Sequence, residues 1–184
     1  MFKKVGWKMT KTDYERIVPI VLHAFDQAGI ILTDEEKSNI EVADFGLNDI
    51  DNIGLQIVTY VNTKRVCAKE LVLLPHQTCP EHKHVNTNGN LGKEETFRCR
   101  SGEVYLYVPG QHGHRLKATI PDTILTVFHE ISLKPGEQFT LLPNTLHWFQ
   151  AGPNGAIVSE FSTRSTDETD VFTDTRIVRK PVIE

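Results

Sequence analysis

Two histidines separated by one residue begin a set of side chains that suits metal binding. His82 and His84 are followed by Glu95 and, further along the chain, by His147. Alternate residues of an extended strand project from the same face, so both imidazoles of the pair can reach one ion. One carboxylate beside several imidazoles suits a divalent ion such as Mn, Fe, Co, Ni or Zn. The spacing therefore predicts one metal site built from these four side chains.

The local sequence favours strands for these ligands. In an α-helix, residues two apart lie about 200° apart around the axis, so His82 and His84 could not chelate one ion from a helix. Glu95 begins a strand-like run at residues 95–108 that is interrupted at Ser101 and Gly102. We therefore expect the ligands to face the inside of a small β-barrel.

The composition narrows the class of protein. The chain has 184 residues, of which 39% are hydrophobic and 24% charged, and this suits one globular domain over residues 1–184. The formal net charge of −4 and the lack of a basic block argue against a nucleic-acid partner. Three widely spaced cysteines, an odd number, argue against a disulfide framework and for a reducing compartment.

The sequence also lacks the patterns of exported and membrane proteins. Residues 1–8 are basic, but the apolar run that a signal peptide needs does not follow them. No segment approaches the roughly 20 apolar residues that a membrane-spanning helix requires. We therefore expect a cytoplasmic protein without a membrane partner.

Residues 1–50 are predicted to form a helical segment. Thr12 begins a capping-box pattern, and apolar residues at helical spacing follow it as far as Phe25. Gly29 would end this helix, and Thr33 would cap a second, shorter helix that reaches about Val42. We expect the segment to pack against the outside of the barrel or against a partner subunit.

Residues 51–178 are predicted to form the barrel. Many short strands with turns between them indicate a sandwich or barrel. The expected strands, rich in β-branched and aromatic residues, are 54–61, 65–74, the His-pair strand, 95–108, 124–133, 139–142, one beginning at His147, and 156–162. A polar loop at residues 86–93 separates the His pair from Glu95, and the acidic stretch 165–175 is predicted to pack back across the barrel mouth.

The ligand residues also carry a family resemblance. The sequence resembles the two motifs of the cupin superfamily, through His-x-His with a later Glu and Gly, and through the Pro-x-x-x-His at residues 143–147. It departs from the first motif, because ten residues separate His84 from Glu95 where cupins usually have three or four. The resemblance implies an all-β cupin fold, a double-stranded β-helix or jelly-roll barrel, here with a short helical N-terminal segment. Longer stretches, over roughly residues 25–178, resemble the D-lyxose isomerases (the D-lyxose ketol-isomerase family); they are residues 70–84, 93–100, 143–152 and 172–176.

Resemblance to the D-lyxose isomerases implies a Mn(II)-dependent aldose–ketose interconversion. The family acts on D-lyxose and D-xylulose and usually on D-mannose and D-fructose. Its metal ligands fall on the four side chains already identified by their spacing. Its catalytic positions match Lys93, Glu160 and Asp174. Co, Ni, Fe or Zn would suit the same ligands, and the exposed edges that such sheets leave favour a homodimer.

The residue types suit that chemistry. Isomerisation moves a proton from C2 to C1 of the sugar through an enediol, for which Glu160 is the candidate base and Lys93 the candidate stabiliser of the enediolate. Strand alternation places Glu160 on the face that Val158 and Ser162 share. Each role has an alternative, because Glu160 and Lys93 could be solvated surface charges and Asp174 could pair with Arg176.

Two other classes of function stay open from the sequence. A metal-dependent cupin dioxygenase would use the same ligands with iron and O₂, and a sugar-binding cupin would need no catalytic residues. The charged barrel mouth, with Lys93, Glu160 and Asp174, favours a polyol over an apolar substrate. The sequence leaves open the metal, the choice between pentose and hexose, and the choice between enediol and hydride transfer.

Overall fold

Two helices begin the part of the chain that the computed structural model describes, which is residues 9–87, 89–111, 113 and 115–179. Helix α1 (Lys11–Gln27) begins after Thr10, whose hydroxyl accepts a hydrogen bond from the backbone of Asp13. The predicted start at Thr12 is therefore wrong, because Thr10 already caps the helix. Neither described helix is both long and apolar enough to cross a membrane.

The second predicted helix is shorter than expected. Thr33 and Glu36 form the predicted capping box, but α2 (Asp34–Ser38) ends well before Val42. Strand β1 (Glu41–Ala43) takes the place of its expected last turn. The reason is tertiary, because β1 pairs antiparallel with β2 (Leu55–Asn62), and that pairing outweighs local helix propensity.

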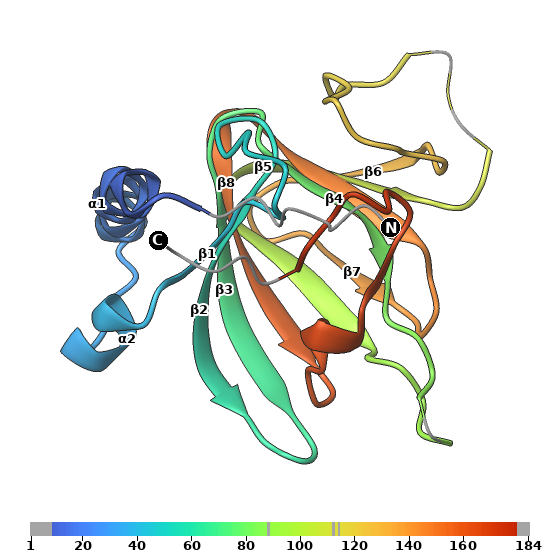
Figure 1. Ribbon diagram of the computed structural model, residues 1–184, viewed down its shortest axis with the longest axis horizontal. Coiled ribbons are helices and arrows are strands. Elements are labelled where there is room, and N and C mark those ends of the chain that lie inside the picture. The colour runs from blue at the N-terminus through green and yellow to red at the C-terminus, as the bar shows by residue number, and fades with distance from the viewer. Residues whose placement is uncertain (1–8, 88, 112, 114, 180–184) are drawn as a thin grey trace, which may run out of the picture.

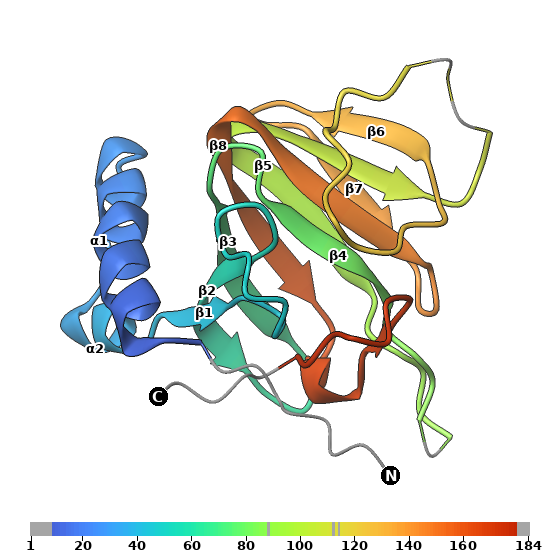
Figure 2. The same cartoon turned by 45° about the horizontal axis from the view of Figure 1, so that its top comes forward.

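Helix α1 packs on the outer face of the sheet, beside β2 and β3 (Figures 1 and 2). Its buried stripe, Ile17, Val21 and Phe25, belongs to one apolar cluster with Val58 and Val72. Helix α1 therefore covers the outside of the barrel, which is one of the two places expected for the helical segment.

One curled antiparallel sheet forms the rest of the fold (Figure 1). Its main path runs β1-β2-β3-β8-β4-β9, and β5 pairs with β6, β7 and β8. The remaining strands are β3 (Cys67–Leu73), β4 (Thr78–Lys83), β5 (Glu95–Val108), β6 (His129–Leu133), β7 (Gln138–Leu141), β8 (His147–Ser162) and β9 (Val171–Phe172).

The two longest strands, β5 and β8, curl the sheet. Their pairing shifts register between Cys99 and Ser101 and again between Gly102 and Val104. Such bulges bend a strand without ending it. As a result β8 pairs with β4 near its start and with β3 near its end. The prediction of separate strands at His147 and at 156–162 is therefore wrong, because they are the two halves of one bent strand.

The expected strand 124–133 is also shorter, since β6 begins only at His129. The preceding residues form an irregular segment that packs over Tyr107 and Trp148. Backbone N–H groups of Thr126 and Val127 donate to the buried carboxylate of Glu81, at 2.6 and 2.9 Å, instead of to a neighbouring strand. A side chain distant in the sequence thus takes the hydrogen bonds that a strand would have used.

Gly102 lies at the bend of β5. Substituting it tests whether β5 and β8 must approach one another as closely as they do there. Its φ is +72°, and an added Cβ would lie 2.0 Å from the carbonyl oxygen of Gly155. We expect Gly102→Ala to lower the free energy of unfolding in urea by clearly more than the about 1–2 kcal/mol that a left-handed conformation costs an L-residue. Gly29→Ala is the control, because Gly29 has φ +67° and open space around it. Equal losses in both variants would show that the close approach is not needed.

Candidate metal centre and active site

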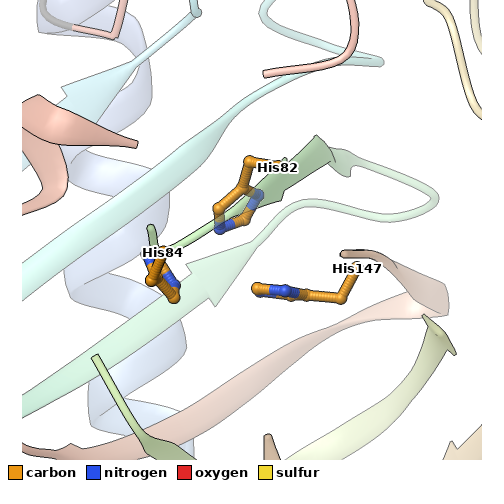
Figure 3. Close-up of side chains that lie close together, drawn as sticks. All are labelled: His82, His84 and His147. Atoms are coloured by element: carbon orange, nitrogen blue, oxygen red, sulfur yellow. The ribbon is translucent and has the colours of Figure 1, made fainter. Parts of the chain in front are cut away.

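Three buried imidazoles converge at one end of the barrel interior. His82 on β4 and His147, the first residue of β8, are antiparallel partners, and His84 lies just beyond β4. Figure 3 shows the three rings pointing toward one another, and their centroids lie 4.3 to 5.4 Å apart. One nitrogen of each ring lies within 4.8 Å of the others. The histidines expected to share a strand face, His82 and His84, do so.

The outer nitrogen of each ring is held by an oxygen acceptor. Nδ1 of His82 and Nδ1 of His147 lie 2.8 and 2.9 Å from backbone carbonyl oxygens, and Nδ1 of His84 lies 2.6 Å from Asp170 Oδ1. These oxygens accept hydrogen bonds, so each Nδ1 carries the proton. The Nε2 atoms are left as the inward-facing ligand atoms, which is the arrangement of metal-binding histidines.

Glu95 completes the set. Its Oε1 lies 3.0 Å from Nε2 of His84 and 3.1 Å from Nε2 of His147. The Nε2 of His147 is buried and has no hydrogen bond with proper geometry among the described residues. A carboxylate oxygen and an unprotonated ring nitrogen both carry lone pairs and repel each other. A cation, either a proton or a metal ion, is therefore required between this oxygen and the two Nε2 atoms. Three imidazoles and one carboxylate therefore fit a divalent ion.

The charge states around Glu95 follow from its neighbours. Burial by itself would raise the pKa of Glu95, but Lys93 and His84 hold this pKa well below its usual value. Burial lowers the pKa of His84, yet the carboxylates of Glu95 and Asp170 raise it overall to about 9. Burial, together with the other two imidazoles, holds the pKa of His82 well below its usual value, so this ring is neutral.

Lys93 lies beside the metal ligands and is buried, so it is not a solvated surface charge. Its Nζ lies 2.8 Å from Glu95 Oε2, 2.9 Å from Glu160 Oε1 and 3.3 Å from Asp167 Oδ1. Burial opposes its charge, but Glu160 and Glu95 raise the pKa of Lys93 well above its usual value. Lys93 therefore remains an ammonium group. The tight approach of Gly92, where a Cβ would lie 2.1 Å from the His84 carbonyl oxygen, brings the loop end to this position.

Glu160 lines the cavity inside the barrel, on the strand face that it shares with Val158 of the core. It lies on β8 between Lys69 on β3 and Phe97 on β5, its register partners on either side. Only 4% of the residue is exposed, so the alternative of an outward, solvated glutamate is wrong. Lys69 is a second buried ammonium, 3.7 Å from Glu160 Oε1 and 2.6 Å from Asp167 Oδ2.

Lys69, Asp167 and Asp170 belong to the site although the sequence did not single them out. The acidic stretch was expected only to cross the barrel mouth. Its residues Asp167 and Asp170 reach into the site, from the 3₁₀ helix η1 (Asp167–Thr169) and from just before β9. Burial would raise the pKa of Asp167, but Lys93, Lys69 and Arg179 hold it well below its usual value. Strand alternation could have found Lys69, since it shares a face with Leu71 of the core.

Asp174 lies apart from this cluster. Its carboxylate accepts from Arg176 Nη2 at 2.7 Å and from Thr123 Oγ1 at 3.1 Å, and it does not line the cavity beside the ligands. Hydrogen bonds from Arg176 lower the pKa of Asp174 to about 2. The structure therefore supports the alternative in which Asp174 pairs with Arg176 and fastens the C-terminal segment.

Comparisons of the sequence with known proteins give a consistent description. A family model described as D-lyxose isomerase matches residues 25–184. The D-lyxose/D-mannose isomerase of Thermosediminibacter oceani is 58% identical over 179 residues, which cover 96% of this chain and 99% of that protein. The D-lyxose ketol-isomerase of Cohnella laeviribosi is 55% identical and covers 96% and 98%.

A solved structure supports the expected fold. The crystal structure of L-ribose isomerase from Acinetobacter sp. DL28 superposes with a TM-score of 0.74 at 15% identity, and the match covers 97% of this chain and 99% of that one. At this identity the likeness concerns the fold alone. The expectation of a mostly β, cupin-type barrel with a helical N-terminal segment is confirmed.

Removing an imidazole tests the metal centre. We expect His82→Gln and His147→Gln to lower the bound metal after dialysis against Mn(II), measured by mass spectrometry, from about one ion per chain to a small fraction. Loss of one of four ligands weakens metal binding even where the groups that hold the remaining ligands are intact. His23→Gln on α1 is the control. Undiminished metal in both variants would contradict the ligand set.

Asp174 tests the ion pair at the C-terminal segment. Its pKa in the folded protein lies below the usual value of 3.8, so its contribution to stability is present above about pH 4 and is lost as the pH falls toward 2. We expect Asp174→Asn to lower the melting temperature at pH 7 by about 2–4 °C, which corresponds to roughly 1 kcal/mol in a domain of this size. The difference from wild type should shrink near pH 3. Asp122→Asn, at an exposed partner of Arg176, is the control, and an equal loss there would contradict the assignment.

Proposed function

The chain belongs to the D-lyxose isomerase family, and we propose that it interconverts D-lyxose with D-xylulose and D-mannose with D-fructose. The observation that carries the proposal is the buried pair of Lys93 and Glu160, with Nζ and Oε1 2.9 Å apart, directly beside the ligand Glu95. The relative from Thermosediminibacter oceani, named for both sugars and 58% identical, supports the same substrates.

The proposed reaction moves one proton between neighbouring carbons of the open-chain sugar. A divalent ion held by the three histidines and Glu95 would polarise the sugar's carbonyl and adjacent hydroxyl oxygens. The carboxylate of Glu160 takes the proton from C2 and returns it to C1, while the proton of the C2 hydroxyl passes to the oxygen on C1, so that no net proton is consumed. A carboxylate placed in this way contributes roughly 10²–10⁴ in rate.

Lys93 stabilises the charge that develops during this transfer. Its ammonium group is fixed by Glu95 and Glu160 and is shielded from water. As C2 loses its proton, negative charge spreads onto the neighbouring oxygen, and a pre-positioned cation in a buried site lowers the energy of that state. Since the pKa of Lys93 lies well above its usual value, it acts by its charge and not as a base.

Glu160 suits the role of base better than Asp167 does. Asp167 is held by Lys69 at 2.6 Å, by Lys93 at 3.3 Å and by Arg179 at 3.4 Å, and its pKa lies well below its usual value. A carboxylate held by three cations and with so low a pKa is a weak base. Asp167 therefore positions the two lysines.

We propose Mn(II) as the resident ion, with Co, Ni, Fe or Zn able to use the same ligands. Three nitrogens and one oxygen accept each of these ions, and their supply in the cell decides between them. The resemblance to D-lyxose isomerases favours Mn(II). The dioxygenase and sugar-binding alternatives have less support, because the relatives are named as isomerases and the site cavity is lined by carboxylates and ammonium groups.

We further propose one cupin domain over residues 1–184 that forms a homodimer in the cytoplasm. Among the described strands β6 and β7 each pair only with β5, so each leaves a free edge to which a second copy can add. Three buried free cysteines suit a reducing compartment. Sedimentation at micromolar concentration should give about twice the mass of the chain, and a monomer alone would exclude the dimer.

Glu160→Gln tests the base. After EDTA treatment and addition of Mn(II), the wild type should form ketose from D-lyxose and from D-mannose, and the variant should be slower in kcat by about 10²–10⁴ because it cannot take the proton. Its metal content should be unchanged. Glu94→Gln, at the exposed residue beside Glu95, is the control. A fully active Glu160→Gln would exclude this base, and a wild type inactive with Mn, Co and Ni would exclude the isomerase.

A further inference from the structure

A second cavity lies beside the site and has no role in the proton transfer described above. It has a volume of about 100 Å³, and its lining includes Thr59, Asn62, Lys69, Asp167, Glu168 and Arg179. Both Thr59 and Glu168 are exposed, so the cavity opens to solvent. Lys69, Asp167 and Arg179 also line the cavity at the metal ligands. These three side chains are therefore common to the walls of both cavities.

The cavity at the metal ligands is too small for a whole sugar. Its volume is about 30 Å³, whereas small-molecule sites usually measure about 300–1,000 Å³. Beside the charged groups, its lining includes the apolar side chains of Leu71, Phe97 and Phe149, which offer nothing to sugar hydroxyl groups. This cavity therefore suits the reacting end of the sugar. The remaining carbon atoms of the sugar must then extend toward the polar side of the cavity.

The polar side leads to the second cavity along a continuous line of charges. Lys93 lies 2.8 Å from the ligand Glu95 and 3.3 Å from Asp167. Asp167 in turn lies 2.6 Å from Lys69 and 3.4 Å from Arg179. Each sugar hydroxyl both donates and accepts hydrogen bonds, so hydroxyl groups can bond to the ammonium groups and carboxylates along this line.

We propose that the second cavity binds the hydroxyl groups at the far end of the open-chain sugar, near C5 and C6, and thereby sets the length of sugar accepted. This inference rests on the proposed function, which places C1 and C2 at the metal. Thr59 on β2 is the residue best placed to control that length. It follows Ile57 of the barrel core on the same strand face and forms part of the outer wall of the cavity.

Filling the cavity tests the inference. Thr59→Tyr adds an aromatic ring where the wall is open, and tyrosine is well tolerated in strands. The probes are D-mannitol and D-arabinitol, unreactive six- and five-carbon polyols, with Kd measured by calorimetry on Mn(II)-loaded protein. We expect the variant to bind D-mannitol at least tenfold more weakly, as the loss of room for one carbon unit implies, and D-arabinitol less than threefold more weakly. The KM for D-mannose should rise by the same factor as the Kd of D-mannitol, and the KM for D-lyxose by the same factor as the Kd of D-arabinitol.

Controls separate this result from other effects. Thr140→Tyr places the same ring on an exposed residue of β7 and should leave both Kd values unchanged. Thr59→Leu, a smaller obstruction, provides the test if the tyrosine variant does not fold, and should weaken D-mannitol binding more than D-arabinitol binding. Equal weakening of both polyols, or none, would overturn the inference. Failure of the isomerase proposal would appear separately, as a wild type without ketose formation.

Discussion

The burial of one carboxylate, Glu95, is the constraint on which the rest of the site depends. The residue is 1% exposed, and an ionised group so deeply buried costs several kcal/mol unless charges or hydrogen bonds compensate it. Compensation comes from Lys93 at 2.8 Å and from Nε2 of His84 at 3.0 Å. The same arrangement that makes this burial possible also creates a pocket of ligand atoms for a divalent ion.

Each buried charge needs a charge of opposite sign beside it, and a series of such pairs extends across the barrel mouth. Lys93 is itself buried and needs Glu160 and Asp167, and Asp167 is in turn held by Lys69 and Arg179. The C-terminal segment supplies Asp167 and Arg179, the last members of this series. The proton transfer and the charge stabilisation proposed above would use the same charged groups.

The apolar parts of the fold keep these charges in register. Inside the barrel, Leu71, Phe97 and Phe149 pack below the site, and outside it the stripe of α1 covers β2 and β3. Strands packed on both faces hold their side chains rigidly, as a site of closely spaced charges requires. The buried carboxylate of Glu81 adds a further restraint, because it joins β4, which carries His82, to the irregular segment before β6.

The sequence alone determined the features that depend on local periodicity. Alternation along a strand identified the shared face of His82 and His84 and the face common to Val158, Glu160 and Ser162, and helical spacing identified the buried stripe of α1. Tertiary structure decided which distant residues meet: Lys69 and Asp167 join the site, Asp174 pairs with Arg176, and β8 continues through its bend. The physical reason is that periodicity reports which face a side chain occupies, whereas strand pairing and loop packing select its partners.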